Sequence, residues 1–453
     1  MVRKSLVALA LTIAFPAAHA QLAAKNTVEL YGILDIGFES IDNGDVSVNR
    51  ISSGLSTGSR WGIRGREDLG GGYEAVFTLE SRIEIDTGQV SNNGAIYYCG
   101  NPPACPSVVL TSPLPPTVAP AVRGGINAVN AALLAAVSTV NSPQALFDRQ
   151  AYAGLITPFG AVLAGRQYTP GYEVFAKYNS FFDSFAGTPG HLSAINIRAN
   201  NAVQYRAELK GFTLAAMYGF GGAEGTAGGR SERTTVTRGD DFWGLEFQYN
   251  SKPFGVGAAY QQNRTVTYAA PNENQKGLET FNLGGYIGLG EAKIFAQYMK
   301  SQNDNPVLRP EDIQNIVIAT GGNLTAINNI LGGLFINRFD INSLRGVAGK
   351  TDIDLYHLGL EMPLGNGKLI AAYNHSEDSS RSAWATADAN VDAYAIAYYY
   401  YLSKRTWLYG AFALANNKDQ SRAGLGAACC VGGWTTGQGE DSRNLQIGMR
   451  HIF

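Results

Sequence analysis

One stretch of the chain, residues 59–86, carries the pattern that decides the fold. It reads SRWGIRGREDLGGGYEAVFTLESRIEID. Charged and apolar residues alternate on both sides of its Gly-Gly-Gly turn: Arg60, Arg64, Arg66, Glu74, Glu80, Arg82 and Glu84 share one side, and Trp61, Ile63, Tyr73, Phe77, Leu79 and Ile83 share the other. A period of two predicts β-strands, whose successive side chains point to opposite faces. One face of this sheet is apolar, and the other carries charges that a dry core would reject.

The same alternation recurs in sixteen segments. They are approximately residues 27–40, 58–67, 72–86, 146–156, 160–168, 200–208, 212–220, 241–250, 255–265, 279–289, 291–300, 352–362, 367–376, 391–402, 405–416 and 443–453. Most of them are close to the length of about 9–11 residues that a tilted strand needs to cross a bilayer. The lengths therefore fit membrane-spanning strands.

The connections between these segments alternate between short and long. Tight turns such as TPFG, LKG and PLGNG alternate with long loops such as 41–57, 87–145 and 169–199. In hydrocarbon every backbone polar group needs a partner, so a spanning sheet must close on itself. Short periplasmic turns and long external loops are typical of outer-membrane barrels. We therefore predict an all-β fold, a 16-stranded antiparallel transmembrane β-barrel, in preference to a soluble sandwich, which does not predict alternating loop lengths.

A barrel of about sixteen strands is wide enough to hold an aqueous channel. Its inner face meets water, so the charged face of the alternating strands belongs inside. The aromatic clusters at 242–249 and 397–410 fit the girdles that flank the lipid-facing band, although ordinary strand propensity explains them as well.

Charge and the first residues bear on location. The 453 residues include 35 Lys and Arg against 37 Asp and Glu. The chain therefore lacks the excess of basic residues that is typical of nucleic-acid-binding proteins. The opening MVRKSLVALALTIAFPAAHA combines a basic start, a short apolar run and a small-residue end. This pattern predicts a signal peptide at 1–20, with the barrel at 21–453, since the run is too short for a membrane anchor. We expect export to the outer membrane.

Four cysteines, Cys99, Cys105, Cys429 and Cys430, lie in Gly/Pro-rich segments. Export permits disulfides, and four cysteines allow three connectivities. We favour Cys99–Cys105 because the separation is short. A zinc site is the rival, but no histidine lies near either pair. The sequence predicts neither metal nor cofactor.

The sequence contains few indications of a catalytic site. The histidines are scattered, and no Ser/His/Asp spacing, HExxH motif or phosphate loop occurs. A channel rather than an enzyme is predicted. A substrate-specific channel and, behind it, a barrel enzyme remain the alternatives. The enzyme would need a histidine with a serine or acidic partner at the barrel rim.

Several stretches together resemble a known family. They are VELYGILDIGFE, SRWGIRGREDLGGGYEAVFTLESR, LFDRQAYAGLITPFGAVLAGRQYTPGYEV and the end IGMRHIF. They resemble the trimeric general-diffusion porins of Gram-negative outer membranes, of the neisserial and burkholderial type. The resemblance implies a homotrimer amid outer-membrane lipid and lipopolysaccharide, passive diffusion of ions and small hydrophilic solutes, and a third loop, 169–199, folded into the pore. The second loop, 87–145, is unusually long for the family, so its contact with a neighbouring subunit stays open.

The resemblance also implies roles for single residues. Arg60, Arg149 and Arg198 resemble the wall arginines of a pore constriction, and Asp183 resembles the acid of the facing loop. Arg82 joins the wall by its inward parity. Where the family often has a Pro-Glu-Phe-Gly-Gly-like tip, this chain has Ser-Phe-Ala-Gly at 184–187, which leaves the number of acids open.

Further charges follow from parity. Arg64, Arg66 and Glu80 are expected to face the lumen, and Glu173 is a further candidate loop acid. An excess of arginine favours anions in a narrow passage, so the sum predicts weak anion preference.

Two residues are predicted to act outside the pore. Arg166 shares parity with Val162 and Ala164, so it should point outward, and it resembles an intersubunit arginine of the trimer. Phe453 resembles the terminal signal that the barrel-assembly machinery reads.

Overall fold

The computed structural model describes residues 26–44, 47–90, 146–181, 187–192, 195–220, 241–265, 275–303, 318–322, 349–379, 381–382, 390–418, 421, 423–425, 433–435 and 439–453. The predicted signal peptide, most of the second-loop insert, Asp183 and all four cysteines lie outside these ranges. Among the described residues, no helix is long and apolar enough to cross a membrane.

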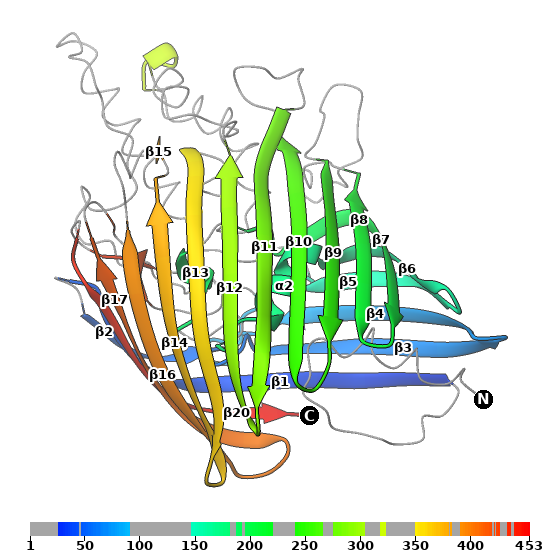
Figure 1. Cartoon of the computed structure of the whole chain (residues 1–453), viewed down its shortest axis with the longest axis horizontal. Coiled ribbons are helices and arrows are strands. Elements are labelled where there is room, and N and C mark those ends of the chain that lie inside the picture. The colour runs from blue at the N-terminus through cyan, green and yellow to red at the C-terminus, as the bar shows by residue number, and fades with distance from the viewer. Residues whose placement is uncertain are drawn as a thin grey trace.

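Sixteen antiparallel strands form a closed barrel, which confirms the predicted fold (Figure 1). The wall strands are β1 (Asn26–Asp42), β3 (Arg60–Gly70), β4 (Tyr73–Arg82), β5 (Gln150–Thr157), β6 (Gly160–Tyr168), β7 (Arg198–Leu209), β8 (Phe212–Gly219), β9 (Phe242–Asn250), β10 (Phe254–Thr265), β11 (Gln275–Leu289), β12 (Ala292–Asn303), β13 (Gly349–Leu364), β14 (Gly367–Asp378), β16 (Val391–Tyr401), β17 (Thr406–Asn417) and β20 (Ser442–Ile452). Each pairs with its neighbour, and β20 pairs with β1 to close the wall.

The first long loop, predicted at 41–57, is shorter than expected. It contains β2 (Ser47–Ser53), which pairs with the C-terminal part of β1, whereas β3 pairs with the N-terminal part. The second wall strand is thus interrupted at 54–59. Gly54 has a φ of 72°, which turns the chain out of the wall at no steric cost. The remaining short elements are β15 (Arg381–Ser382), β18 (Ala423–Gly424), β19 (Gly433–Trp434) and the 3-10 helix η1 (Pro189–Leu192).

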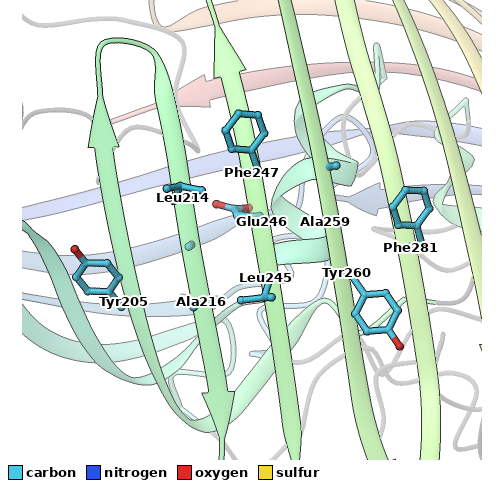
Figure 2. Close-up of a pocket in the computed structure, with 11 residues that line it drawn as sticks. Tyr205, Leu214, Ala216, Leu245, Glu246, Phe247, Ala259, Tyr260 and Phe281 are labelled. Atoms are coloured by element: carbon cyan, nitrogen blue, oxygen red, sulfur yellow. The ribbon is translucent and has the colours of Figure 1, made fainter.

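Alternation separates the two faces of the wall. In β8, Phe212, Leu214 and Tyr218 are exposed on the outside, while Thr213 and Met217 are buried on the inside. The outer face of β7–β11 carries a shallow apolar hollow of about 430 Å³, lined in part by Leu214, Ala216 and Leu245 (Figure 2). The hollow faces away from the lumen, so it belongs to the lipid-facing band and not to the path of a solute.

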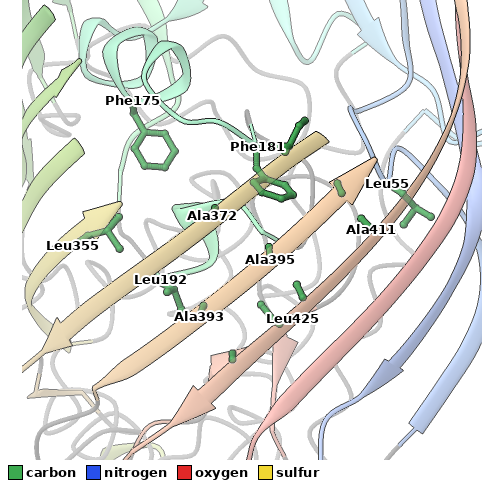
Figure 3. Close-up of a cluster of buried hydrophobic side chains, with 14 of the residues drawn as sticks. Leu55, Phe175, Phe181, Leu192, Leu355, Ala372, Ala393, Ala395, Ala411 and Leu425 are labelled. Atoms are coloured by element: carbon green, nitrogen blue, oxygen red, sulfur yellow. The ribbon is translucent and has the colours of Figure 1, made fainter. Parts of the chain in front are cut away.

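The inner face is not polar all round. On β14, β16 and β17 it presents small apolar side chains, among them Ala372, Ala395 and Ala413. Phe181 and Leu192 pack on this arc from inside the barrel (Figure 3). The charged inner face that the alternation predicts is therefore confined to the remaining arc.

The aromatic cluster at 397–410 is divided by the same alternation. Tyr398 and Tyr400 are on the outer face, where a girdle is expected, and Tyr400 is exposed. Tyr399, Trp407 and Tyr409 are buried among the inner side chains. Only half of the cluster can therefore serve as an interfacial girdle, because neighbouring strand residues point to opposite faces.

A helix carries the chain from the wall into the lumen. α2 (Pro170–Lys177) begins directly after β6, with Thr169 as its N-cap: Tyr172 N donates to Thr169 Oγ1 at 3.3 Å. Pro170 occupies the first helical turn, where a missing N–H costs nothing. The Thr-Pro pair thus ends the strand and starts the helix.

Candidate pore constriction

Neutral polar side chains of the wall hold the described parts of the segment that follows β6, which are residues 169–181, 187–192 and 195–199. Gln261 bridges both ends of this segment: its Oε1 accepts from Gly171 N and its Nε2 donates to Asn196 O, each at 2.9 Å. Further contacts come from successive strands: Gln297 Nε2 to Phe175 O (3.2 Å), Ser180 N to His357 Nε2 (3.2 Å), Asn374 Nδ2 to Gly187 O (2.9 Å) and Ser376 Oγ to Leu192 O (3.3 Å). We call Gln261, Gln297, His357, Asn374 and Ser376 the anchor row.

Small residues of the wall make room for the same segment. A Cβ on Gly284 would lie 2.7 Å from the Cβ of Tyr178, and one on Gly257 would lie 2.6 Å from its ring. Real Cβ atoms do not approach so closely, so glycine is required under Tyr178. The anchor row and these glycines explain why the segment lies along the inner wall instead of extending away from it.

The interrupted segment 54–59 also turns into the barrel. Leu55 is fully buried, and the buried carboxylate of Asp35 accepts hydrogen bonds from Ser56 N (3.1 Å) and Thr57 N (3.2 Å). Tyr409, from the opposite end of the chain, donates to the same carboxylate at 2.8 Å. Nothing in the alternation predicted this inward turn, since it depends on strand ends that meet only when the barrel closes.

Three arginines converge on this inward turn. Arg60 Nε donates to Gly58 O at 2.9 Å, and its Nη2 donates to Thr57 Oγ1 at 2.8 Å. A Cβ on Gly58 would lie 3.3 Å from Arg149 Nη1 and 3.6 Å from Arg82 Nη1. The predicted wall arginines on β3, on β4 and directly before β5 are therefore brought together around one glycine. We call Arg60, Arg82, Arg149 and Arg198 the arginine group.

The arginine group is partly compensated by carboxylates. Glu80 and Arg149 are both buried, with 1% of each side chain exposed. They form an ion pair in which Arg149 Nε lies 2.8 Å from Glu80 Oε1. Tyr31 Oη donates to the second oxygen of Glu80 at 3.1 Å, and Arg82 pairs with Glu84. Within the described parts of the chain, Glu80 and Glu84 thus each form an ion pair with one arginine of the group. Two further carboxylates lie beside the group: Asp35 holds the inward turn, and Asp148 Oδ1 accepts from Arg82 N at 2.9 Å.

Arg198 meets the other arginines through a tyrosine. Its Nη2 donates to Tyr168 Oη at 3.2 Å, and Arg149 Nη2 donates to the same oxygen at 2.7 Å. The structure therefore brings all four predicted wall arginines into one group, although no pattern in the sequence indicates that Tyr168 joins them.

The predicted loop acid Glu173 does not contact the arginine group through any ion pair among the described residues. It pairs with Arg206 of β7, which also meets Glu208 at 2.8 Å and Glu246 at 3.0 Å. This cluster ties the first turn of α2 to the wall. Burial, and then the nearby charge of Arg206, lower the pKa of Lys177 at the other end of α2. Arg206 was missed because its partners come from three separate elements.

The remaining predicted residues are placed as follows. Arg64 pairs with Glu29 at 2.9 Å and lies over the Tyr31 ring, and Arg66 pairs with Glu74, all on the inner face. Asp183 lies outside the described residues. Among the described residues, no three His, Cys, Asp or Glu side chains are grouped as a metal site.

The two residues predicted to act outside the pore have contacts within the chain. Arg166 Nε donates to Asp148 O at 2.6 Å, and its Nη1 donates to Asn200 Oδ1. Phe453 closes the wall with Gly32: each backbone N–H donates to the other residue's carbonyl, at 3.1 and 3.2 Å. Their roles in the trimer and in assembly stay predictions.

Replacing Gly58 with valine is expected to displace the arginine group. Its side chain would extend toward Arg149 Nη1 and Arg82 Nη1, which lie 3.3 and 3.6 Å from the position of a Cβ. Single-channel recording should show a lower conductance with a folded barrel. Gly410→Val on β17, where a Cβ would approach only Gln446 O, at 3.9 Å, is the control for adding bulk. An equal conductance change in that variant would contradict the prediction.

The fold and site together define a class. A closed antiparallel barrel with an apolar outside, an inner arc of charge and chain segments folded against its inner wall is a membrane channel of the outer-membrane type. A family model described as Gram-negative porin matches residues 5–420. The chain belongs to the Gram-negative porin family and is an outer-membrane porin.

Individual relatives agree with this assignment. The chain is 25% identical to Outer membrane porin protein 32 of Delftia acidovorans, over the whole of both chains. It is 24% identical to an outer membrane porin protein of Bordetella pertussis, over 92% of this chain and 94% of the relative. Among solved structures, the anion-selective porin from Comamonas acidovorans superposes with a TM-score of 0.60 at 22% identity, covering 94% of this chain and all of the other. A trimer form of OmpT from Vibrio cholerae has a TM-score of 0.55 at 16% identity, covering 95% and 100%.

Proposed function

We propose that the chain forms a water-filled passage for passive diffusion of ions and small hydrophilic solutes, with weak preference for anions. The observation that carries the proposal is the arginine group: among the described residues, four guanidinium groups lie close together on one arc of the inner face, and two of them, Arg82 and Arg149, form ion pairs with carboxylates. The similar porin from Comamonas acidovorans is anion-selective, which supports the same sign of preference.

The mechanism requires no bond chemistry. Residues 169–199 are proposed to occupy part of the lumen and to limit solute size. A solute between this segment and the arginine group passes positive charges in a narrow space, where they are screened less than in bulk water. Anions are therefore stabilised in the passage relative to cations. A trimer is proposed as the assembled form, with Arg166 at the subunit contact.

Planar-bilayer recording tests the proposal. In a KCl gradient, the reversal potential should show a chloride-to-potassium permeability ratio above one. Large ohmic currents shared by unrelated small anions would support general diffusion. Saturable conductance for one class of anion would support a substrate-specific channel instead, and hydrolytic activity without current would support an enzyme.

The variant Arg60→Glu is expected to shift the permeability ratio toward potassium by at least about twofold, because it reverses a charge that is poorly screened in the passage. Arg443→Glu makes the same charge change on the exposed outer face of β20 and should leave the ratio unchanged. An unchanged ratio in Arg60→Glu would remove Arg60 from the constriction.

A further inference from the structure

Tyr168 lies where the chain leaves the wall for the lumen. It is the last residue of β6 and directly precedes Thr169, the N-cap of α2. Its ring stacks on Tyr172 of α2, with centroids 5.1 Å apart and planes inclined by 23°. The guanidinium carbon of Arg198 lies over the same ring, 4.8 Å from its centroid. The ring is therefore held by the lumenal helix and by an arginine.

The hydroxyl of Tyr168 joins two strands. It accepts from Arg149 Nη2, directly before β5, and from Arg198 Nη2, at the start of β7. A hydroxyl oxygen has two lone pairs, so it can accept from both arginines at once. One neutral oxygen thus determines the relative orientation of two cations from separate strands.

The neutrality of this acceptor matters for the electrostatics. Arg149 is compensated by Glu80 and Arg82 by Glu84. Arg198 has no carboxylate within ion-pair distance among the residues that the structure describes, and its Nε has no hydrogen-bond partner there. A carboxylate at position 168 would cancel part of this charge, whereas a phenol holds the guanidinium and leaves its charge available to a passing anion.

We propose that Tyr168 is a positioning residue that orients Arg149 and Arg198 and thereby sets the strength of anion preference. The proposal rests on the proposed anion-preferring function and deepens it by naming an uncharged side chain as a determinant of selectivity.

The first test is Tyr168→Phe, which keeps the ring and its stacking and removes the hydroxyl. Arg149 and Arg198 each lose one hydrogen bond, and the loss of one net hydrogen bond changes the orientation equilibrium of a side chain by about fivefold, corresponding to about 1 kcal/mol. The chloride-to-potassium permeability ratio should fall by about two- to fivefold, up to this limit. Conductance in symmetrical salt should change much less, since the cross-section is conserved.

The second variant, Tyr168→Gln, restores a neutral acceptor. Its permeability ratio should lie closer to that of the parent than the ratio of Tyr168→Phe does. Tyr205→Phe is the matched control, because Tyr205 lies on the outer face and donates to Phe159 O. It should leave the ratio unchanged. Heat-modified gel mobility verifies that each barrel is folded.

The outcomes separate this proposal from the function on which it rests. If Arg198→Gln lowers the ratio while Tyr168→Phe leaves it unchanged, the role of Tyr168 is overturned and the anion preference stands. If Tyr168→Gln behaves like Tyr168→Phe, positioning by a neutral acceptor is overturned. A parent channel without anion preference, unaffected by Arg198→Gln, overturns both proposals.

Discussion

Replacing Glu80 with leucine is expected to lower the free energy of unfolding by about 3–5 kcal/mol, because it breaks a buried ion pair and leaves the partner charge uncompensated. Glu80 and Arg149 are both buried, and Glu80 also accepts a hydrogen bond from the hydroxyl of Tyr31. The same change adds net positive charge to the arginine group, so the permeability ratio should move toward chloride. Urea unfolding of the refolded barrel and reversal potentials measure the two effects.

The control for Glu80→Leu is Glu74→Leu on the same strand. Glu74 pairs with Arg66 on the same face, but both side chains are partly exposed to solvent. Exposed ion pairs contribute only about 0–1 kcal/mol. Similar losses of stability in the two variants would show that burial does not determine the strength of these pairs.

Replacing Gln261 with leucine is expected to release residues 169–199 from the wall. The variant removes the partner of Gly171 N and of Asn196 O, and each unsatisfied buried group costs about 1–3 kcal/mol. The two contacts lie at opposite ends of the segment, so one substitution loosens both ends. Lipid vesicles that contain the Gln261→Leu variant should then admit larger sugars than vesicles that contain the parent. Swelling assays with sugars of increasing size measure this change.

Gln302→Leu controls for the loss of a glutamine. Gln302 is exposed near the end of β12 and donates to Asp352. It should keep the parent size limit and the parent gel mobility. If Gln261→Leu also keeps the parent size limit in a folded barrel, then residues 169–199 do not determine which solutes pass.

The strands could be predicted because their signal is local. β6 and β8 were predicted within one residue, since each strand shows its two faces in its own alternation. β2 was missed because the segment 41–57 looks like a loop, and it is a strand only through its pairing with β1. Pairing between strands is not visible in the residues of one strand alone.

The candidate site shows the same division. Parity and family resemblance named Arg60, Arg82, Arg149 and Arg198, and the structure brings them together around Gly58 and Tyr168. The resemblance carried no role for Glu173 toward Arg206, because the two residues are 33 positions apart and meet only when α2 lies against the wall. Residues with neutral side chains, such as Gln261 and Tyr168, carry no charge pattern that could have identified them.

The sequence by itself determined a closed barrel with an apolar outside. Alternation within each strand places apolar side chains toward the lipid and polar side chains toward the water inside. Tertiary structure alone decided which inner arc is charged, which is apolar and which side chains hold the lumenal segments. These features depend on contacts such as Arg149 to Glu80, 69 residues apart, and Tyr409 to Asp35, 374 residues apart. The first contact forms only when β4 pairs with β5, and the second only when the first and last strands pair, so no local pattern encodes them.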